Sequence, residues 1–303
     1  MRRHGLAEPD ARRGTRVAAE GTGTSSLRPM SSGSGSSPTG TTPSANWSEE
    51  LEELHEESSR THFIDVWTRR AIVSKLDGLP PAPFVVDIGC STGYLLEDIQ
   101  RALPGASLAG FDLVFSGLRH AHAGVPGALV GLADACRLPL ADRSADAVVS
   151  ANLLEHVPDD GRALAEICRV LKPGAPAVLV VPAGPGTYDY YDRYLHHQRR
   201  YGRGELAGKA RAVGLLVVDD VHLGWTMYPA FWLVKKRNRA RYDDLRGEAL
   251  KARVLNDIEH TRDSRFGHVA CHVEERVLAR GWKPPFGIRI MTVVRRPPEV
   301  NAP

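Results

Sequence analysis

The 303-residue chain contains 39 lysines and arginines against 36 acidic residues, so its formal net charge is only +3. Residues 1–45 hold six arginines and three acids, which accounts for this excess and leaves the rest of the chain nearly neutral. A neutral body argues against a duplex nucleic-acid partner, because proteins that bind duplexes carry a basic surface. The length suits one large domain with appended segments.

The four cysteines, at positions 90, 136, 168 and 271, lie far apart and match no zinc-binding or redox spacing. We expect reduced thiols, as is usual in the cytosol. No apolar run approaches the roughly 20 residues of a membrane-spanning helix, and the arginine-rich N-terminus lacks the apolar stretch of a secretory signal. These features predict a cytoplasmic protein without a transmembrane segment.

The N-terminal part of the chain divides into two segments. Residues 1–45 are dominated by Gly, Ser, Thr and Pro from Gly21 onward, which predicts a disordered tail, and Met30 is an alternative start site. Residues 46–80 carry apolar side chains at intervals of three and four, which predicts an N-terminal helical cap.

Residues 81–297 alternate apolar runs of strand length with helical patterns, and residues 298–303 are a C-terminal tail. Strands are predicted at 84–88, 107–111, 128–132, 146–150, 177–181, 215–223 and 288–294. Helices are predicted at 93–103, 115–123, 160–171 and 205–213. This alternation predicts an α/β fold with a doubly wound, mostly parallel sheet of seven strands that helices cover on both faces.

The most informative motif joins the first two strands. The first strand runs into Asp87-x-Gly89-x-x-x-Gly93, and the second is followed by Asp112. In nucleotide-binding α/β units, glycines let a ligand approach the backbone, and an acid after the second strand accepts hydrogen bonds from a ribose. A dinucleotide site favours G-x-G-x-x-G, with a pyrophosphate at the helix N-terminus. Asp87 would repel a pyrophosphate but suits an ammonium group, so an NAD-dependent oxidoreductase is the weaker alternative.

Further motifs follow in a fixed order. They are Ala133-Asp134-Ala135, residues 144–151, residues 153–157 and residues 170–174. Together with the glycine turn they resemble the motifs of class I S-adenosylmethionine-dependent methyltransferases of the type-11 branch, strongly over residues 84–182. The resemblance implies a Rossmann-like fold with an antiparallel last strand, and S-adenosylmethionine as co-substrate.

The resemblance also implies a donor site on named residues. The cofactor-binding residues are Asp87, Gly89, Cys90 and Gly93 at the methionine half, Asp112 and Leu113 at the ribose, Asp134 and Ala135 at the adenine, and Asn152 beneath the methionine moiety. A turn cap is the alternative role for Asp134, and a simple acid at the strand end is the alternative for Asp112.

Two histidines are the candidates for a catalytic base. His156 follows the fourth strand and His197 follows the fifth, at the sheet edge where such folds bind ligands. A structural role is the alternative for His156, and the following Arg200 and Tyr201 are candidates for fixing the start of the next helix. The adjacent His196 and His197 have no third ligand at a suitable spacing, so no metal site is predicted.

Residues 224–285 form an insertion that the core does not need. The aromatic block at 225–234 passes directly into a cationic block at 235–241. The plain interpretation is a buried helix whose next turn is solvated. The alternatives are a lid over an anionic substrate and a weak contact with a membrane surface.

The favoured function is methyl transfer from S-adenosylmethionine to a small-molecule acceptor, at oxygen or otherwise at nitrogen or carbon. The insertion and the aromatic segment at 188–201 suit a substrate pocket better than an open nucleic-acid groove. The alternatives are methylation of RNA or protein and a non-catalytic module that binds S-adenosylmethionine. The sequence gives no prediction of oligomeric state.

Overall fold

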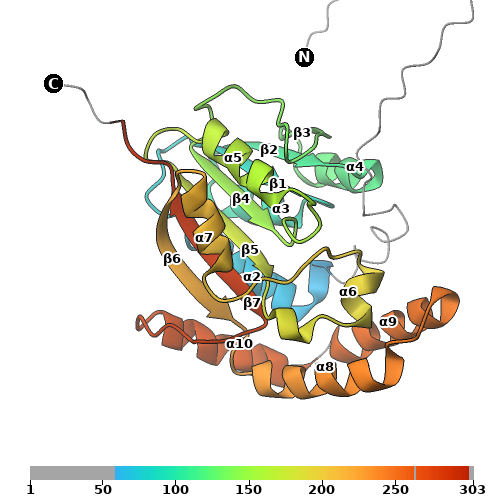
Figure 1. The fold of residues 1–303 in the computed structure, drawn as a ribbon. Coiled ribbons are helices and arrows are strands. Elements are labelled where there is room, and N and C mark those ends of the chain that lie inside the picture. Colours follow the sequence, from blue (N-terminus) through green and yellow to red (C-terminus); the bar gives the residue numbers. More distant parts are fainter. Residues whose placement is uncertain (1–58, 263, 300–303) are drawn as a thin grey trace, which may run out of the picture. The chain divides into compact units, whose positions relative to one another are not determined.

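A computed structural model describes residues 59–262 and 264–299, and their strands form one seven-stranded sheet in the order β3-β2-β1-β4-β5-β7-β6 (Figure 1). The strands are β1 (Phe84–Ile88), β2 (Ser107–Asp112), β3 (Leu129–Leu132), β4 (Ala147–Ala151), β5 (Pro176–Pro182), β6 (Leu216–Leu223) and β7 (Arg289–Arg295). Strands β1 to β5 pair in parallel, whereas β7 is antiparallel to both β5 and β6. The predicted α/β fold with an antiparallel last strand is therefore confirmed.

The helices of the described residues lie before, between and after these strands. They are α2 (Phe63–Val73), α3 (Tyr94–Ala102), α4 (Phe115–Gly124), α5 (Asp160–Val170), α6 (Tyr190–Tyr194), α7 (Glu205–Ala212), α8 (Tyr228–Tyr242), α9 (Gly247–Arg262) and α10 (Arg265–Leu278), with a short 3-10 turn at Pro185–Thr187. Each predicted strand and core helix has both ends within one residue of its prediction. The predicted tail at 1–45 and the first part of the helical cap lie outside the described residues.

Alternating side chains of the strands divide the core into two layers. Val86 and Ile88 of β1 pack against α5 and α7, whereas Val85 packs against α2, α3, α4 and α10 (Figure 1). Successive residues of a strand face opposite sides of a sheet, so a strand covered on both sides must be apolar throughout. Strand β5 meets this demand, because all seven of its residues are buried.

The turn between β1 and α3 depends on glycine at two points. Gly89 and Gly93 have φ values of +78° and +84°, a region that residues with a Cβ seldom adopt. At Gly93 a Cβ would also lie 2.7 Å from Cα of Ala121 in α4. Gly93 therefore lets α3 begin and pack closely against α4.

The insertion contains α8, α9 and α10, and the orientation of α8 contradicts the plain interpretation of its sequence. Trp232 and Leu233 in the aromatic block are 44% and 61% exposed, while Lys235 in the cationic block is only 8% exposed. Lys235 is buried because its ammonium pairs with Asp189 at 2.7 Å beside α6. The prediction of a buried block followed by a solvated turn is therefore wrong.

Among the described residues, every helix is too short or too polar to cross a membrane.

Candidate functional site

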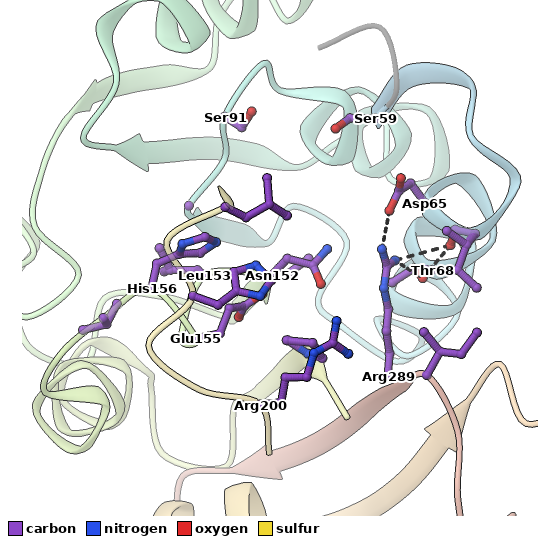
Figure 2. Close-up of a pocket in the computed structure, with 18 of the residues that line it drawn as sticks. Ser59, Asp65, Thr68, Ser91, Asn152, Leu153, Glu155, His156, Arg200 and Arg289 are labelled. Carbon is purple, nitrogen blue, oxygen red and sulfur yellow. Dashed lines mark hydrogen bonds and ion pairs between the residues drawn. The ribbon is translucent and has the colours of Figure 1, made fainter. Parts of the chain in front are cut away.

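A cavity of about 980 Å³ opens at the edge of the sheet where the parallel strands end. The ends of β1, β2 and β4 supply one wall, and α2, α6, α8 and the start of β7 supply the other. In Figure 2, Asp65, Thr68 and Arg289 lie on one side, opposite the turn that carries Asn152 and Glu155. Ligand pockets have volumes of roughly 300–1,000 Å³, so this cavity can hold two small molecules side by side.

Ten of the eleven predicted site residues line this cavity. They are Asp87, Gly89, Cys90, Asp112, Leu113, Asp134, Ala135, Asn152, His156 and His197. The exception is Gly93, which lies one residue from lining residues on both sides but packs against Ala121 of α4. The structure therefore gives Gly93 a packing role in place of a contact with the cavity.

Asp87 is a buried acid near the end of β1, just before the glycine loop. Its Oδ1 atom has no hydrogen-bond partner among the described residues. Burial, together with the neighbouring Asp112, raises the pKa of Asp87 to about 8. A buried, unpartnered carboxylate at a cavity wall is suited to accept hydrogen bonds from a cationic group.

The loop after β1 is bound to the end of β2. The backbone N–H groups of Gly89 and Cys90 donate to the carbonyl of Phe111 at 2.8 and 3.2 Å. The Asp112 carboxylate accepts from the N–H of Ser91 at 2.9 Å, and from the N–H groups of Leu113 and Val114. A carboxylate offers about four acceptor positions, so Asp112 can take one further donor from the cavity without rearranging.

Asp134 and Asn152 follow the ends of β3 and β4. Asp134 Oδ1 accepts from the N–H of Cys136 at 2.8 Å, so Asp134 caps its turn and lines the cavity at once. Asn152 has φ +52°, and its N–H donates to the carbonyl of Val180 at 2.8 Å. A left-handed conformation outside glycine costs free energy, and such residues concentrate at ligand sites.

His156 and His197 meet in the cavity although 41 residues separate them in the sequence. Their ring centroids are 4.7 Å apart with nearly perpendicular planes. Nδ1 of His197 lies 2.7 Å from Oδ1 of Asp192. Burial lowers the pKa of His197, against the raising effect of Asp192, and this favours a neutral imidazole.

Asp192 is the centre of a buried ion-pair network behind these histidines. Its Oδ1 also accepts from Nε of Arg200 at 2.6 Å, and Lys235 lies 3.8 Å from its other oxygen. Burial alone would raise the pKa of Asp192, but His197, Arg200 and Lys235 hold that pKa well below its usual range. The carboxylate is therefore ionised and fixes the position of each neighbour.

Several cavity residues were not singled out from the sequence. Glu155 lies within the motif at residues 153–157, and its side chain is 0% exposed. Neither of its carboxylate oxygens bonds another described residue. Burial raises the pKa of Glu155 to about 8, although Arg289 and Arg200 lower it. Arg289 reaches Asp65 of α2 at 2.5 Å across 224 residues of sequence. No spacing rule connects such distant positions.

Helix α8 contributes to the second wall of the cavity through Phe231, Lys235 and Asn238. The Lys235 ammonium lies 5.1 Å from the ring centroid of Tyr191 and 5.5 Å from that of Phe231. These distances are typical of cation–π interactions. The helix therefore presents aromatic and charged groups to the cavity from one face and Trp232 and Leu233 to solvent from the other.

Comparison with known proteins identifies the core of this fold. Residues 86–179 match the type-11 family model, whose description is "Methyltransferase domain". This segment, about a third of the chain, is therefore a methyltransferase domain. S-adenosylmethionine is the co-substrate that the sequence motifs predict for this domain.

Characterised relatives resemble parts of this chain. A ubiquinone/menaquinone biosynthesis C-methyltransferase from Desulfotalea psychrophila is 34% identical over 136 residues, which cover 44% of this chain and 54% of the relative. A ubiquinone biosynthesis O-methyltransferase from Ralstonia nicotianae is 34% identical over 149 residues, which cover 43% and 62%. The chain thus spans about half the length of these two curated relatives.

A solved structure extends the likeness beyond the core. Haemonchus contortus phosphoethanolamine N-methyltransferase 2, in complex with S-adenosylmethionine, superposes with a TM-score of 0.58 at 15% identity. The superposition covers 83% of this chain and 58% of that one. At this identity the likeness shows the shared fold alone.

The geometry of the cavity fits the co-substrate. Asp87 offers a buried carboxylate oxygen without a partner, which suits the amino group of the methionine moiety. Asp112 offers an acceptor position at the end of β2, the usual place of a ribose contact. Ser91 and Asn152, both with positive φ, shape the backbone between these acids and the histidines.

Proposed function

We propose that this chain transfers the methyl group of S-adenosylmethionine to an oxygen atom of a small molecule. The observation that carries the proposal is the continuity of the cavity. The donor acids Asp87 and Asp112 and the histidines His156 and His197 all line one space. A reaction between two bound molecules needs both sites to open into one another.

The donor half of the proposal assigns a role to each group. When bound, S-adenosylmethionine supplies a methyl group already activated by its sulfonium. Asp87 and the loop backbone at Gly89 and Cys90 hold the amino-acid end, and Asp112 with Leu113 binds the ribose. Asp134 and Ala135 frame the adenine, and Asn152 supports the methionine moiety.

The acceptor half is assigned to the wall formed by the histidines, α6 and α8. A hydroxyl becomes a better nucleophile as its proton leaves, and a neutral imidazole can accept that proton near neutral pH. The Asp192 contact fixes the His197 ring with Nδ1 turned away from the cavity. His156 and His197 are the two proposed bases, and the aromatic rings of Tyr191 and Phe231 favour an acceptor with an apolar body.

The charges at this wall favour a neutral or weakly charged acceptor. Arg200 pairs with Asp192, Lys235 pairs with Asp189, and Arg289 pairs with Asp65. An anionic acceptor would have to compete with these carboxylates. A cavity that encloses the acceptor also suits a small molecule better than a folded RNA or protein.

The test is incubation of the protein with donor labelled in its methyl group and a metabolite extract, with mass spectrometry of the products. We expect one small molecule to gain a methyl group on oxygen, and the Asp112→Ala variant to give no product. His156→Ala and His197→Ala should each lower turnover on that product by at least tenfold. Labelling of the RNA or protein fraction alone would contradict the proposal, as would donor binding that Asp112→Ala leaves unchanged.

A further inference from the structure

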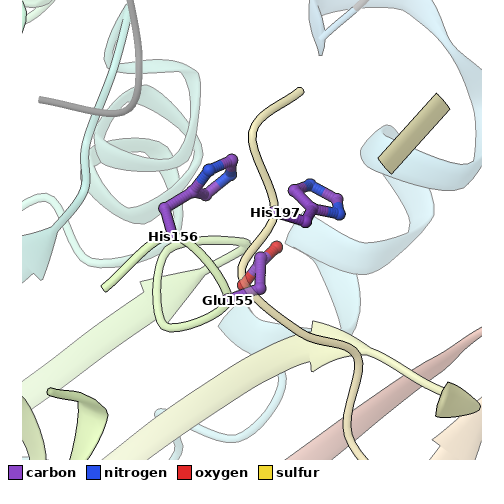
Figure 3. Close-up of side chains that lie close together, drawn as sticks. All are labelled: Glu155, His156 and His197. Carbon is purple, nitrogen blue, oxygen red and sulfur yellow. The ribbon is translucent and has the colours of Figure 1, made fainter. Parts of the chain in front are cut away.

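Three groups that commonly bind metal ions meet at the acceptor wall of the cavity. Glu155, His156 and His197 each offer a ligand atom, and these atoms all lie within 4.8 Å of one another. Figure 3 shows the Glu155 carboxylate below the two imidazole rings, which face each other. Two histidines and one carboxylate are the protein ligands of many catalytic zinc and iron sites.

The backbone holds the two contributing segments together. The N–H of Gln198 donates to the carbonyl of Glu155 at 2.7 Å, and the N–H of His197 donates to the carbonyl of Asp192 at 2.9 Å. The Tyr188 hydroxyl donates to the carbonyl of His197 at 2.8 Å. Backbone hydrogen bonds therefore hold the two segments that carry these three groups beside each other.

The side chains of Glu155 and His197 also have hydrogen-bonding environments that suit a bound cation. Glu155 is fully buried, and neither of its carboxylate oxygens bonds another described residue, which is costly unless a partner binds there. Since Nδ1 of His197 contacts Asp192, Nε2 is the nitrogen that remains for a ligand. A carboxylate on the second nitrogen is the usual support of a metal-bound histidine, because it fixes the ring and raises its basicity.

The nearby cations do not neutralise this arrangement. Arg200 and Lys235 are each paired with a carboxylate, at 2.6 Å and 2.7 Å. Arg289 is paired with Asp65 in the same way. The buried Glu155 carboxylate is the acid at this wall that lacks a cationic partner within salt-bridge distance among the described residues.

We propose that Glu155, His156 and His197 bind a divalent first-row transition-metal ion such as Zn²⁺, with open coordination positions that face the cavity. Resting on the proposed function, this names the acceptor class: a molecule whose hydroxyl or phenol oxygen can coordinate the ion. As the oxygen–metal bond forms, the O–H bond breaks and the proton leaves to solvent water. The ion lowers the pKa of the bound hydroxyl. With the ion bound, the two histidines act as its ligands, and water takes the proton that an ion-free histidine would accept as base.

The test measures metal binding without donor or acceptor, so that it is independent of methyl transfer. Untagged full-length protein is stripped with a chelator and titrated with Zn²⁺ by calorimetry, and Co²⁺ is added separately to record visible absorption. We expect Glu155→Gln, His156→Ala and His197→Ala each to raise the dissociation constant for Zn²⁺ at least tenfold. Each variant should also lose the visible absorption band of bound Co²⁺. The control is His122→Ala, which removes an exposed histidine of α4 and should bind as the parent does.

Asp192, which contacts Nδ1 of His197, allows a second test of the metal site. Asp192→Asn keeps the shape of the side chain but weakens its hold on His197, and it should weaken Zn²⁺ binding by roughly 10–100-fold. Near-ultraviolet circular dichroism establishes which variants are folded, and Glu155→Asp replaces Glu155→Gln if the latter fails. Zn²⁺ binding that is equal in the parent and the ligand variants, or absent in the parent, would overturn the metal site. Either result would leave the donor-binding and labelling tests of the proposed function untouched.

Discussion

Asp87 is an acid whose ionised form is disfavoured by the surrounding protein. It lies buried at the end of β1, and its pKa is raised to about 8 because burial disfavours the ionised form and Asp112 lies nearby. In the unfolded chain its pKa is near the ordinary value of 3.8. The folded protein therefore binds more protons at this residue between these two pH values. Its contribution to stability must fall as the pH rises from about 4 to about 8.

Asp87→Asn should remove this loss and stabilise the donor-free protein at pH 8. The gain is on the order of a few kcal/mol, because one pKa unit corresponds to ~1.4 kcal/mol. At pH 4 little of the difference should remain, since this pH is close to the unfolded-state pKa of 3.8, where the loss begins. Urea denaturation at pH 4, 6 and 8 measures the trend, with the exposed Asp77→Asn as matched control. With the donor at saturation the order should reverse, and a pH-independent difference would contradict the assignment.

A substitution at Gly93 tests whether α3 and α4 pack too closely there to admit a Cβ atom. Gly93→Ala must place a side chain at φ +84° and 2.7 Å from Cα of Ala121, so α3 and α4 must separate. Gly127→Ala is the control, because φ is +102° there but no atom lies within 4 Å of the added Cβ. Both variants lose roughly 1 kcal/mol to backbone strain. We expect Gly93→Ala to lose about 2 kcal/mol more by chemical denaturation, and equal losses would argue against close packing.

In helix α8, ion pairs with another segment decide which residues are buried, against the pattern of apolar and charged residues in its sequence. Its aromatic and cationic blocks follow one another in sequence, but the fold selects Phe231, Lys235 and Asn238 for the inside because they fall on one face. The ammonium of Lys235 enters the protein because Asp189 and Asp192 already lie there. Burial lowers the pKa of Lys235, and Arg200 adds to this, whereas the two acids oppose it.

Lys235→Met should therefore be costly although it replaces a charge by an apolar side chain of similar length. The substitution leaves Asp189 buried without its cation, and breaking a buried pair in this way typically costs about 3–5 kcal/mol. Lys236→Met is the matched control on the solvent face, where the exposed Lys236 lies 5.2 Å from the centroid of the Trp232 ring. The control should change the free energy of unfolding by about 1 kcal/mol or less. Comparable losses in a thermal or urea unfolding series would show that the Lys235 pair contributes little.

The elements that could be predicted from sequence are those whose signal is local. Strand β5 is an apolar run that Pro173-Gly174 precedes, and the turn after β1 needs glycine for its φ values, so both were predictable. The donor wall follows, because parallel strands end at one edge. The acceptor wall was not predictable in the same way. The backbone of Glu155 pairs with Gln198, 43 positions away, and Lys235 pairs with Asp189, so neither contact follows a local sequence period.

The cavity as a whole joins the matched domain to both ends of the described chain. Residues 86–179 supply the donor wall, whereas α2, α6, α8 and β7 lie outside that match and supply the rest. Arg289 connects the two flanks, since its guanidinium contacts Asp65 and donates to Thr68 Oγ1 at 2.7 Å, both in α2 (Figure 2). Acceptor choice is thus expected to depend on segments that lie outside the matched domain.

Arg289→Gln should separate these two halves of the site. The variant loses its ion pair with Asp65, a pair that is 14% exposed on each side, so the free energy of unfolding should fall by about 1–3 kcal/mol. Donor affinity measured by calorimetry should stay within about threefold of the parent, because Asp87 and Asp112 are untouched. The KM for the acceptor should rise about tenfold, since α2 would no longer be held against β7. Arg295→Gln on the same strand is the control, because Arg295 is exposed and its guanidinium donates to the carbonyl of Gly174, away from α2. If Arg289→Gln weakens donor and acceptor equally, then the α2 flank forms part of the donor site, and the division of the cavity drawn above is wrong.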